Sequence, residues 1–175
     1  MEGDMDDVTQ ATVAFVQHHQ AWAAPIVFLL GFCESFAFIS LLVPATGILF
    51  ALGGLIGAVE LAFWPIWLAA ALGAIAGDWL AYELALHFKD RVLALRPFST
   101  HTESISRGIG FFNRFGAAAV FVGRFFGPLR AIVPLVAGLY AMPRWTFQIA
   151  NVASAMVWAT GVLTPGFFGV RWLLG

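Results

Sequence analysis

Charge is scarce in this 175-residue chain. Only 11% of its residues are Asp, Glu, Lys or Arg, whereas a soluble domain carries about 25%. Apolar residues make up 61% of the chain. This balance excludes an ordinary soluble domain and predicts an integral membrane protein. The length leaves room for one membrane domain with few spans, a size that is compatible with a homo-oligomer.

Cysteine and the common catalytic motifs are also missing. The single cysteine, Cys33, cannot form an intramolecular disulfide, and its apolar neighbours favour simple packing over redox chemistry. The sequence has no glycine-rich phosphate loop, no nucleophile elbow and no His/Cys spacing for a metal. Its basic stretch lacks the interleaved aromatics of a nucleic-acid surface. We therefore expect no enzymatic activity, no cofactor, no metal and no nucleic-acid partner.

Lysine and arginine are absent from the first half of the chain. All nine Lys and Arg lie at or after Lys89, and five of them fall between His87 and Arg114, against two acids. The positive-inside rule places this segment in the cytoplasm. It is either a solvated linker or a surface that attracts anionic lipid headgroups.

Two apolar stretches have the length of re-entrant hairpins. Residues 25–59 and 111–142 are each too long for one span of about 20 residues and too short for two spans with a turn. Proline and glycine interrupt both stretches, and such breaks inside a bilayer require surrounding protein or a watery cavity. The predicted helix breaks are Pro44, Gly47, Pro128 and Pro134.

Each predicted hairpin precedes one predicted span, at residues 62–88 and 145–170. Small residues recur along the first span with the spacing that permits close helix contact, at Ala70, Gly73 or Ala74, Gly77 and Ala81. An odd number of crossings per copy inverts the second copy relative to the first. We therefore expect an all-α membrane protein with two opposed re-entrant helical hairpins, each followed by a transmembrane helix, as an inverted repeat.

The remaining segments complete the expected organisation. Residues 1–24 form an acidic N-terminal segment with the composition of an interfacial helix. Residues 25–170 form a single membrane domain in which a basic amphipathic linker, residues 89–110, joins the two copies. Residues 171–175 are a tail.

Isolated charges are the most informative feature of the chain. Glu34 is the only charge among the 39 residues from 21 to 59, and Arg124 and Arg130 are the only charges between 115 and 143. A charge at the centre of a bilayer costs about 2.5–3.5 kcal/mol on insertion scales, so such residues face a cavity or a partner. This pattern favours transport over scaffolding.

The two acids have distinct expected roles. A buried Glu34 without a partner is protonated, and a nearby arginine restores its charge, which makes Glu34 a proton switch. Its alternative role is a structural hydrogen bond to a broken helix end. Asp78 lies four residues before Tyr82, whose hydroxyl is placed to share its hydrogen bonds. The alternative for Asp78 is a polar residue that stabilises packing.

Arg124 and Arg130 are separated by six residues, which on a continuous helix leaves them roughly 240° out of phase. The break at Gly127–Pro128 is placed to direct both guanidinium groups into one cavity suited to a carboxylate or a phosphate. Alternatively they neutralise Glu34 and Asp78 as internal ion pairs. Both roles are compatible, because a pair that opens to admit an anionic headgroup is a transport mechanism. The candidate cavity-lining residues are Thr46, Tyr82, Gln148 and Asn151. The last two are three residues apart and share a helix face, and they either line the same cavity or link helices.

At several of these residues the chain resembles the DedA family of bacterial membrane proteins, whose eukaryotic relatives carry the VTT, or SNARE-associated, domain. The resemblance rests on Glu34, Gly77–Asp78, residues 123–130 (GRFFGPLR), Pro134 and Ala137–Gly138. It implies opposed re-entrant hairpins, essential membrane-embedded charges and lipid translocation in a bacterial inner (cytoplasmic) membrane. Some members recycle undecaprenyl phosphate, others are linked to maintenance of the proton-motive force, and the eukaryotic relatives scramble phospholipids.

By this resemblance, Glu34 matches the acid of the first hairpin, and Arg124 and Arg130 match the arginines of the second. The chain departs from the family where it reads Pro44-Ala45-Thr46-Gly47, because many members have a second acid there. Asp78 is the candidate substitute. Pro128 also lies one place later than in the common pattern, and many members continue into a further helix after the region of Gly166–Gly169.

The expected function is that of a multi-pass lipid carrier. Arg124 and Arg130 hold a lipid phosphate, such as undecaprenyl phosphate or a phospholipid headgroup, while Glu34 switches by protonation and Asp78 tunes an arginine. The expected partners are that headgroup, membrane lipids and protons. Two alternatives remain: a proton-coupled transporter of small ions or drugs that supports the membrane potential, and a non-transporting membrane-organising subunit.

Overall fold

The computed structural model describes residues 20–36, 45–58, 62–89, 112 and 114–174. Within these ranges all regular structure is helical, which confirms the expected all-α class. The helices are α2 (Gln20–Ser35), α3 (Ala45–Ala58), α4 (Phe63–His87), α8 (Ala117–Gly123), α9 (Gly127–Leu139) and α10 (Arg144–Leu174). Most of the expected N-terminal segment, the linker from residue 90 onward, and Pro44 lie outside the described residues.

Two of the helices are long and apolar enough to cross a membrane. These are α4, with 25 residues, and the 26 residues of α10 from Arg144 to Gly169. At 1.5 Å per residue each extends about 37–39 Å, against about 30 Å for the hydrocarbon core of a bilayer. Both helices expose large apolar side chains on one face, among them Leu68, Leu72 and Val157. That pattern suits contact with lipid.

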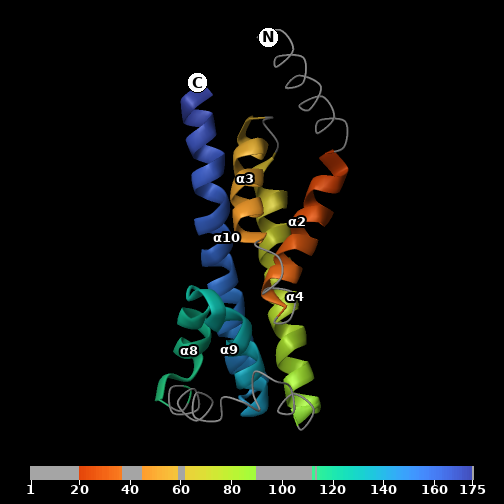
Figure 1. Cartoon of the computed structure of the whole chain (residues 1–175), viewed down its shortest axis with the longest axis vertical. Helices are drawn as coiled ribbons and strands as arrows, with labels where there is room; N and C mark the ends of the chain where they lie inside the picture. The colour runs from red at the N-terminus through yellow and green to blue at the C-terminus, as the bar shows by residue number, and fades with distance from the viewer. Residues whose placement is uncertain (1–19, 37–44, 59–61, 90–111, 113, 175) are drawn as a thin grey trace.

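The shorter helices are shared between the two long ones. Figure 1 shows α2 and α3 at one end of the bundle, and α8 and α9 at the other, while α4 and α10 run along both halves. α2 and α9 pack on α4, whereas α3 and α8 pack on α10. Each pair of short helices is therefore split across both long helices, and the two pairs approach each other near the middle of the bundle.

Glycines permit the closest of these contacts. A Cβ added at Gly77 on α4 would lie 2.6 Å from the carbonyl oxygen of Phe32 on α2, and one at Gly73 would collide with the main chain of Phe28. On the other long helix, a Cβ at Gly57 of α3 would lie 2.5 Å from the carbonyl oxygen of Phe167. The expected small-residue stripe on residues 62–88 is thus confirmed as a close helix interface.

Two of the expected helix breaks lie inside helices. Gly47 falls in the first turn of α3, and α9 continues through Pro134 to Leu139. Proline lacks a donor, but a helix continues past it where neighbouring helices support the backbone, and Pro134 is buried. The main-chain break in this region lies instead between Gly123, where α8 ends, and Gly127, where α9 begins.

The buried apolar residues form two clusters with polar residues between them. One cluster contains Tyr82 on α4 and Phe147 on α10, and the other contains Ala74 and Ala155. Along both helices a gap separates the clusters, and this gap contains the buried polar residues Asp78, Asn151 and Ser154. The candidate site therefore lies where the two apolar cores meet.

Candidate functional site

Arg124 is held by acceptors from two helices. It follows the last residue of α8, and only 6% of it is exposed. Its Nε donates to Ser154 Oγ over 3.0 Å, and its Nη2 donates to Asn151 Oδ1 over 2.6 Å. The same Nη2 forms an ion pair with Asp78. Three acceptors on α4 and α10 thus fix the orientation of this guanidinium group.

Arg130 and Glu34 form the second ion pair. Arg130 lies in the first turn of α9 and donates through Nη1 to Glu34 Oε1 on α2. The Glu34 side chain is 1% exposed, whereas that of Arg130 is 19% exposed. The structure therefore joins the two isolated bases to two acids from the first half of the chain, in agreement with the interpretation of internal ion pairs.

The break between α8 and α9 explains why both arginines reach one place. Residues 124–126 leave the helical path, and Pro128, in the first turn of α9, presets the backbone of the new helix. The side chain of Pro128 itself is outside the described part of the structure. Because the helix restarts after the break, Arg124 and Arg130 line the same small cavity.

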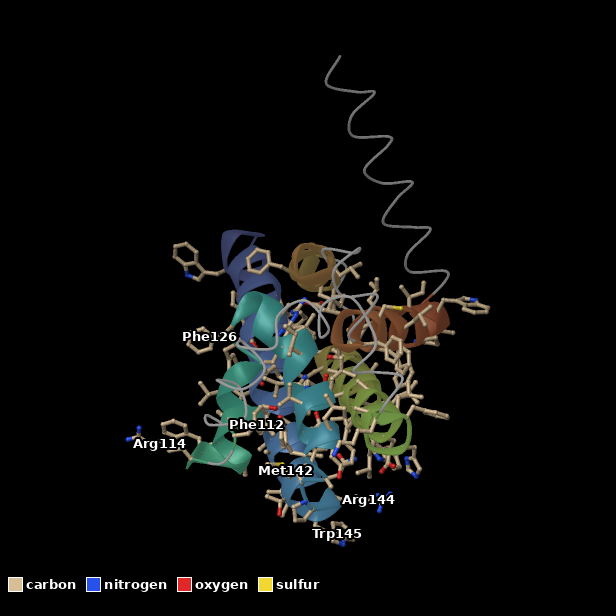
Figure 2. The ribbon with its side chains drawn as sticks, turned by 60° about the horizontal axis from the view of Figure 1, so that its bottom comes forward. Phe112, Arg114, Phe126, Met142, Arg144 and Trp145 are labelled. Carbon is tan, nitrogen blue, oxygen red and sulfur yellow. The ribbon has the colours of Figure 1, made fainter. Side chains whose placement is uncertain are left out.

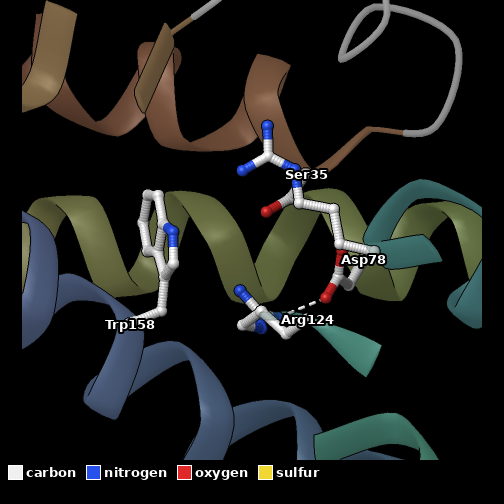
Figure 3. A pocket seen from close by; sticks show the side chains of 5 residues that line it. Ser35, Asp78, Arg124 and Trp158 are labelled. Carbon is white, nitrogen blue, oxygen red and sulfur yellow. Dashed lines mark hydrogen bonds and ion pairs between the residues drawn. The ribbon is translucent and has the colours of Figure 1, made fainter. Parts of the chain in front are cut away.

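This cavity is nearly filled by the charges around it. Its described lining consists of Ser35, Asp78, Arg124, Arg130 and Trp158, and its volume is about 10 Å³ (Figure 3). A space of that size holds about one water molecule. A phosphate group therefore enters only if an ion pair opens.

The cavity lies near the middle of the long helices. Ser154 follows Arg144 by ten residues and precedes Gly169 by fifteen, which corresponds to roughly 15 Å and 22 Å along α10. Asp78 lies similarly inside α4, away from both of its ends. The site therefore lies well inside both candidate spans.

Asn151, one of the expected lining residues, belongs to the Arg124 network. Besides accepting from Arg124, it donates through Nδ2 to the carbonyl of Ile75 over 3.1 Å and to Gln148 Oε1 over 3.3 Å. Gln148 supports Asn151 and does not line the cavity. The two residues share a face of α10 as expected, and Asn151 also links α10 to α4.

Tyr82 is placed differently from the expectation. Its hydroxyl donates to the main-chain carbonyl of Met142, and its ring stacks on Phe147 at a centroid distance of 4.4 Å. It therefore connects α4 to the start of α10 and does not share the hydrogen bonds of Asp78. The side chain of Thr46, another expected lining residue, lies outside the described part of the structure.

Ser35, Ser154 and Trp158 are parts of this site that the sequence patterns did not predict. Ser154 and Trp158 follow Asn151 by three and seven residues, so they share its helix face, and this spacing was the available signal. No comparable signal marked Ser35, which directly follows Glu34. A tryptophan in an apolar helix is more often a packing or interfacial residue, which hides such a role in the sequence.

A second charged group lies at the end of the bundle and is exposed. Glu83 Oε1 accepts from Arg144 Nε over 2.8 Å and from Trp79 Nε1 over 3.3 Å. Figure 2 shows Arg144 and Trp145 on the periphery at this end, where Trp145 is 82% exposed. Aromatic and cationic side chains of this kind are typical of a membrane interface.

Comparisons with known proteins agree with a membrane protein. Residues 43–168 match the family described as the VTT domain. The chain is 31% identical to inner membrane protein YabI of Escherichia coli (strain K12) over 152 residues, which cover 87% of this chain and 60% of that protein. It is 26% identical to an uncharacterised membrane protein of Buchnera aphidicola over 153 residues, with the same two coverages.

A third relative is an uncharacterised membrane protein of Mycobacterium tuberculosis (strain H37Rv). It is 35% identical over 115 residues, which cover 62% of this chain and 53% of that protein. The chain thus spans about 60% of the length of the first two curated relatives. No solved structure matches it.

Proposed function

We propose that this chain, which belongs to the VTT-domain family of membrane proteins as its resemblance to DedA proteins predicted, moves a lipid phosphate headgroup between the leaflets. The cargo is a polyprenyl phosphate, such as undecaprenyl phosphate, or a phospholipid. One observation carries the proposal: two arginines from one broken helical segment line the same small cavity, and each forms an ion pair with a buried acid. Guanidinium groups bind carboxylate and phosphate with the same planar geometry.

The mechanism is an exchange of acceptors. In the paired state the cavity has room for about one water, so the headgroup must replace a carboxylate. Arg130 has the more exposed side chain of the two arginines, 19% against 5%. In the proposed cycle, protonation of Glu34 removes its attraction for Arg130, which then turns to the phosphate. Arg124 stays in place on Asp78, Asn151 and Ser154.

The packing of the helices supports the proposed inverted repeat. α2 packs on α4 as α8 packs on α10, and α3 packs on α10 as α9 packs on α4. Exchanging the set α2, α3 and α4 with the set α8, α9 and α10 therefore leaves the pattern of contacts unchanged. A two-fold relation of this kind is the arrangement that places a site at mid-membrane between repeats.

The lengths of the short helices support two re-entrant hairpins, at residues 25–59 and 111–142. α9 has 13 residues, and the described parts of α2 and α3 have 16 and 14, all fewer than the about 20 residues that a span requires. In the proposed orientation the hairpins enter from opposite sides and meet at the level of the cavity. The protein is then a multi-pass protein of a bacterial inner membrane, the location that the name of YabI gives for that relative.

A second candidate, a proton-coupled transporter of small ions, is favoured by the size of the cavity. Space for one water beside Asp78 suits passage of a proton better than passage of a headgroup through a rigid site. The two candidates differ in the arginines. Small-ion transport depends on the carboxylates, whereas headgroup transport requires Arg130.

The test is leaflet exchange in proteoliposomes. Labelled polyprenyl phosphate and labelled phospholipid are followed at two pH values for the unaltered chain, Arg130→Ala and Glu34→Gln. Arg144→Ala is the matched control, because it also removes an arginine from an ion pair, but at an exposed end of the bundle. We expect pH-dependent exchange that both site variants lose and the control keeps. Unchanged exchange in folded Arg130→Ala would refute the headgroup carrier.

A further inference from the structure

Three hydrogen-bond donors at the cavity have no acceptor in the described part of the protein. The indole Nε1–H of Trp158 and the hydroxyl of Ser35 are the first two, and both residues are 7% exposed. The third is the Nη1 group of Arg124, since the three bonds of that side chain use Nε and Nη2. The acceptors around Arg124 therefore leave one end of its guanidinium group available to a ligand.

Two other tryptophans in the described part of the structure have an acceptor for the indole N–H, whereas Trp158 has none. Trp67 Nε1 donates to Thr160 Oγ1 over 3.0 Å, and Trp79 Nε1 donates to Glu83. In Figure 3 the nitrogen edge of the Trp158 ring faces the space between Ser35 and Arg124. Because this N–H lies at the cavity and has no acceptor among the described residues, it is expected to meet water or a ligand there.

The chemistry of these groups selects an anion. An indole N–H donates and cannot accept, and the Arg124 Nη1 group likewise only donates. Neither group binds a cation, whereas several donors that line one cavity suit the terminal oxygens of a phosphate. The Ser35 hydroxyl lies at the interface between α2 and α4, since a Cβ at Gly77 would lie 3.0 Å from Ser35 Cβ.

We propose that Ser35 and Trp158, together with the Nη1 group of Arg124, bind the phosphate oxygens of the ligand when the Arg130–Glu34 pair opens. This inference rests on the proposed function and adds to it the residues that recognise the phosphate. Arg124 is positioned before the ligand arrives, because Asp78, Asn151 and Ser154 hold it. The Arg130 side chain then closes the site from the more exposed side. The shared ligand chemistry is a phosphate, as a lipid headgroup or as the free ion.

The binding test uses the purified chain in detergent and isothermal titration calorimetry. The probes are farnesyl phosphate, farnesol, which lacks the phosphate, and inorganic phosphate. The site variants are Trp158→Phe and Ser35→Ala, which remove a donor and keep the ring or the Cβ. Trp67→Phe is the matched control, since it also removes an indole donor, but at the bond to Thr160.

We expect the dissociation constant for farnesyl phosphate to rise about tenfold or more in each site variant, because a hydrogen bond to a charged group contributes that much to binding. The control variant should bind farnesyl phosphate with unchanged affinity. Farnesol should bind all four proteins alike. Equal losses for farnesyl phosphate and farnesol would show a packing effect and overturn the inference. If inorganic phosphate also binds, and the two site variants weaken its binding while the control does not, the site recognises phosphate itself. If inorganic phosphate does not bind, the site recognises phosphate only as a lipid headgroup.

A second measurement remains informative if Trp158→Phe fails to fold. In the unaltered protein labelled with ¹⁵N-tryptophan, the indole resonance of Trp158 should shift on titration with farnesyl phosphate and not with farnesol. The Trp67 resonance should stay in place, and an unmoved Trp158 resonance overturns the inference. If lipid exchange and Arg130 dependence hold while Trp158 is unaffected, only this inference fails. If the unaltered chain exchanges no lipid, the proposed function fails, and the inorganic phosphate arm still decides whether the cavity binds phosphate.

Discussion

The ion pair between Asp78 and Arg124 provides the sharpest test of how the buried charges support the fold. The perturbations are Asp78→Asn, Arg124→Gln and the double variant, which together form a double-mutant cycle. Both side chains are buried, with 8% and 5% exposed. Each single variant leaves one buried charge without its ion-pair partner, whereas the double variant leaves two neutral amides that can bond to each other.

The magnitude follows from this geometry. Removal of one partner from a buried pair costs about 3–5 kcal/mol, because the remaining charge is uncompensated. If the two losses were independent, the double variant would lose about 6–10 kcal/mol, a large part of the about 5–15 kcal/mol that stabilises a typical domain. Since the second substitution removes the stranded charge, we expect the double variant to be destabilised no more than either single variant. The free energy of coupling should then be at least as large as one single loss, about 3–5 kcal/mol.

The assay is equilibrium unfolding in mixed micelles of dodecyl maltoside and SDS, followed by far-UV circular dichroism. The matched control is the same cycle on Glu83 and Arg144, with Glu83→Gln and Arg144→Gln, because that pair is bidentate but lies at the exposed end of the bundle. Its coupling should fall within experimental error, since exposed ion pairs contribute little. Additive losses at Asp78 and Arg124 would refute the conclusion that these charges depend on each other.

Two further predictions concern packing and the second polar contact. Gly73→Ala should destabilise the protein by about 1–3 kcal/mol, because its Cβ would collide with the main chain of Phe28. The control variant Gly161→Ala, with nothing near its Cβ, should be neutral or stabilising. Equal thermal unfolding midpoints for the two variants would contradict this prediction. Tyr82→Phe should lower the free energy of unfolding by about 1–3 kcal/mol in the same assay, because the carbonyl of Met142 loses its donor while the ring stack remains. An unchanged unfolding curve would show that this hydrogen bond contributes nothing to stability.

Composition and pattern were sufficient to predict the class of the protein and much of its helical content. Sparse charge over long apolar stretches requires a lipid environment, and a helix satisfies all of its own backbone donors there. The small-residue stripe predicted a close interface on residues 62–88, which Gly73 and Gly77 form against α2. The helix breaks were less accurate, because proline and glycine also occur inside helices that neighbouring elements support, as at Pro134.

The sequence by itself determined that Glu34, Asp78, Arg124 and Arg130 need partners, since isolated charges in apolar surroundings are too costly to leave unpaired. It did not determine which acid meets which base, because a count of two against two permits either pairing. Only the tertiary structure decided this, by packing α2 and α9 on α4 and α8 on α10, so that residues 46 and 96 positions apart come into contact. The same packing brought Ser35 and Trp158 to the cavity, where their roles depend on neighbours that sequence spacing does not specify.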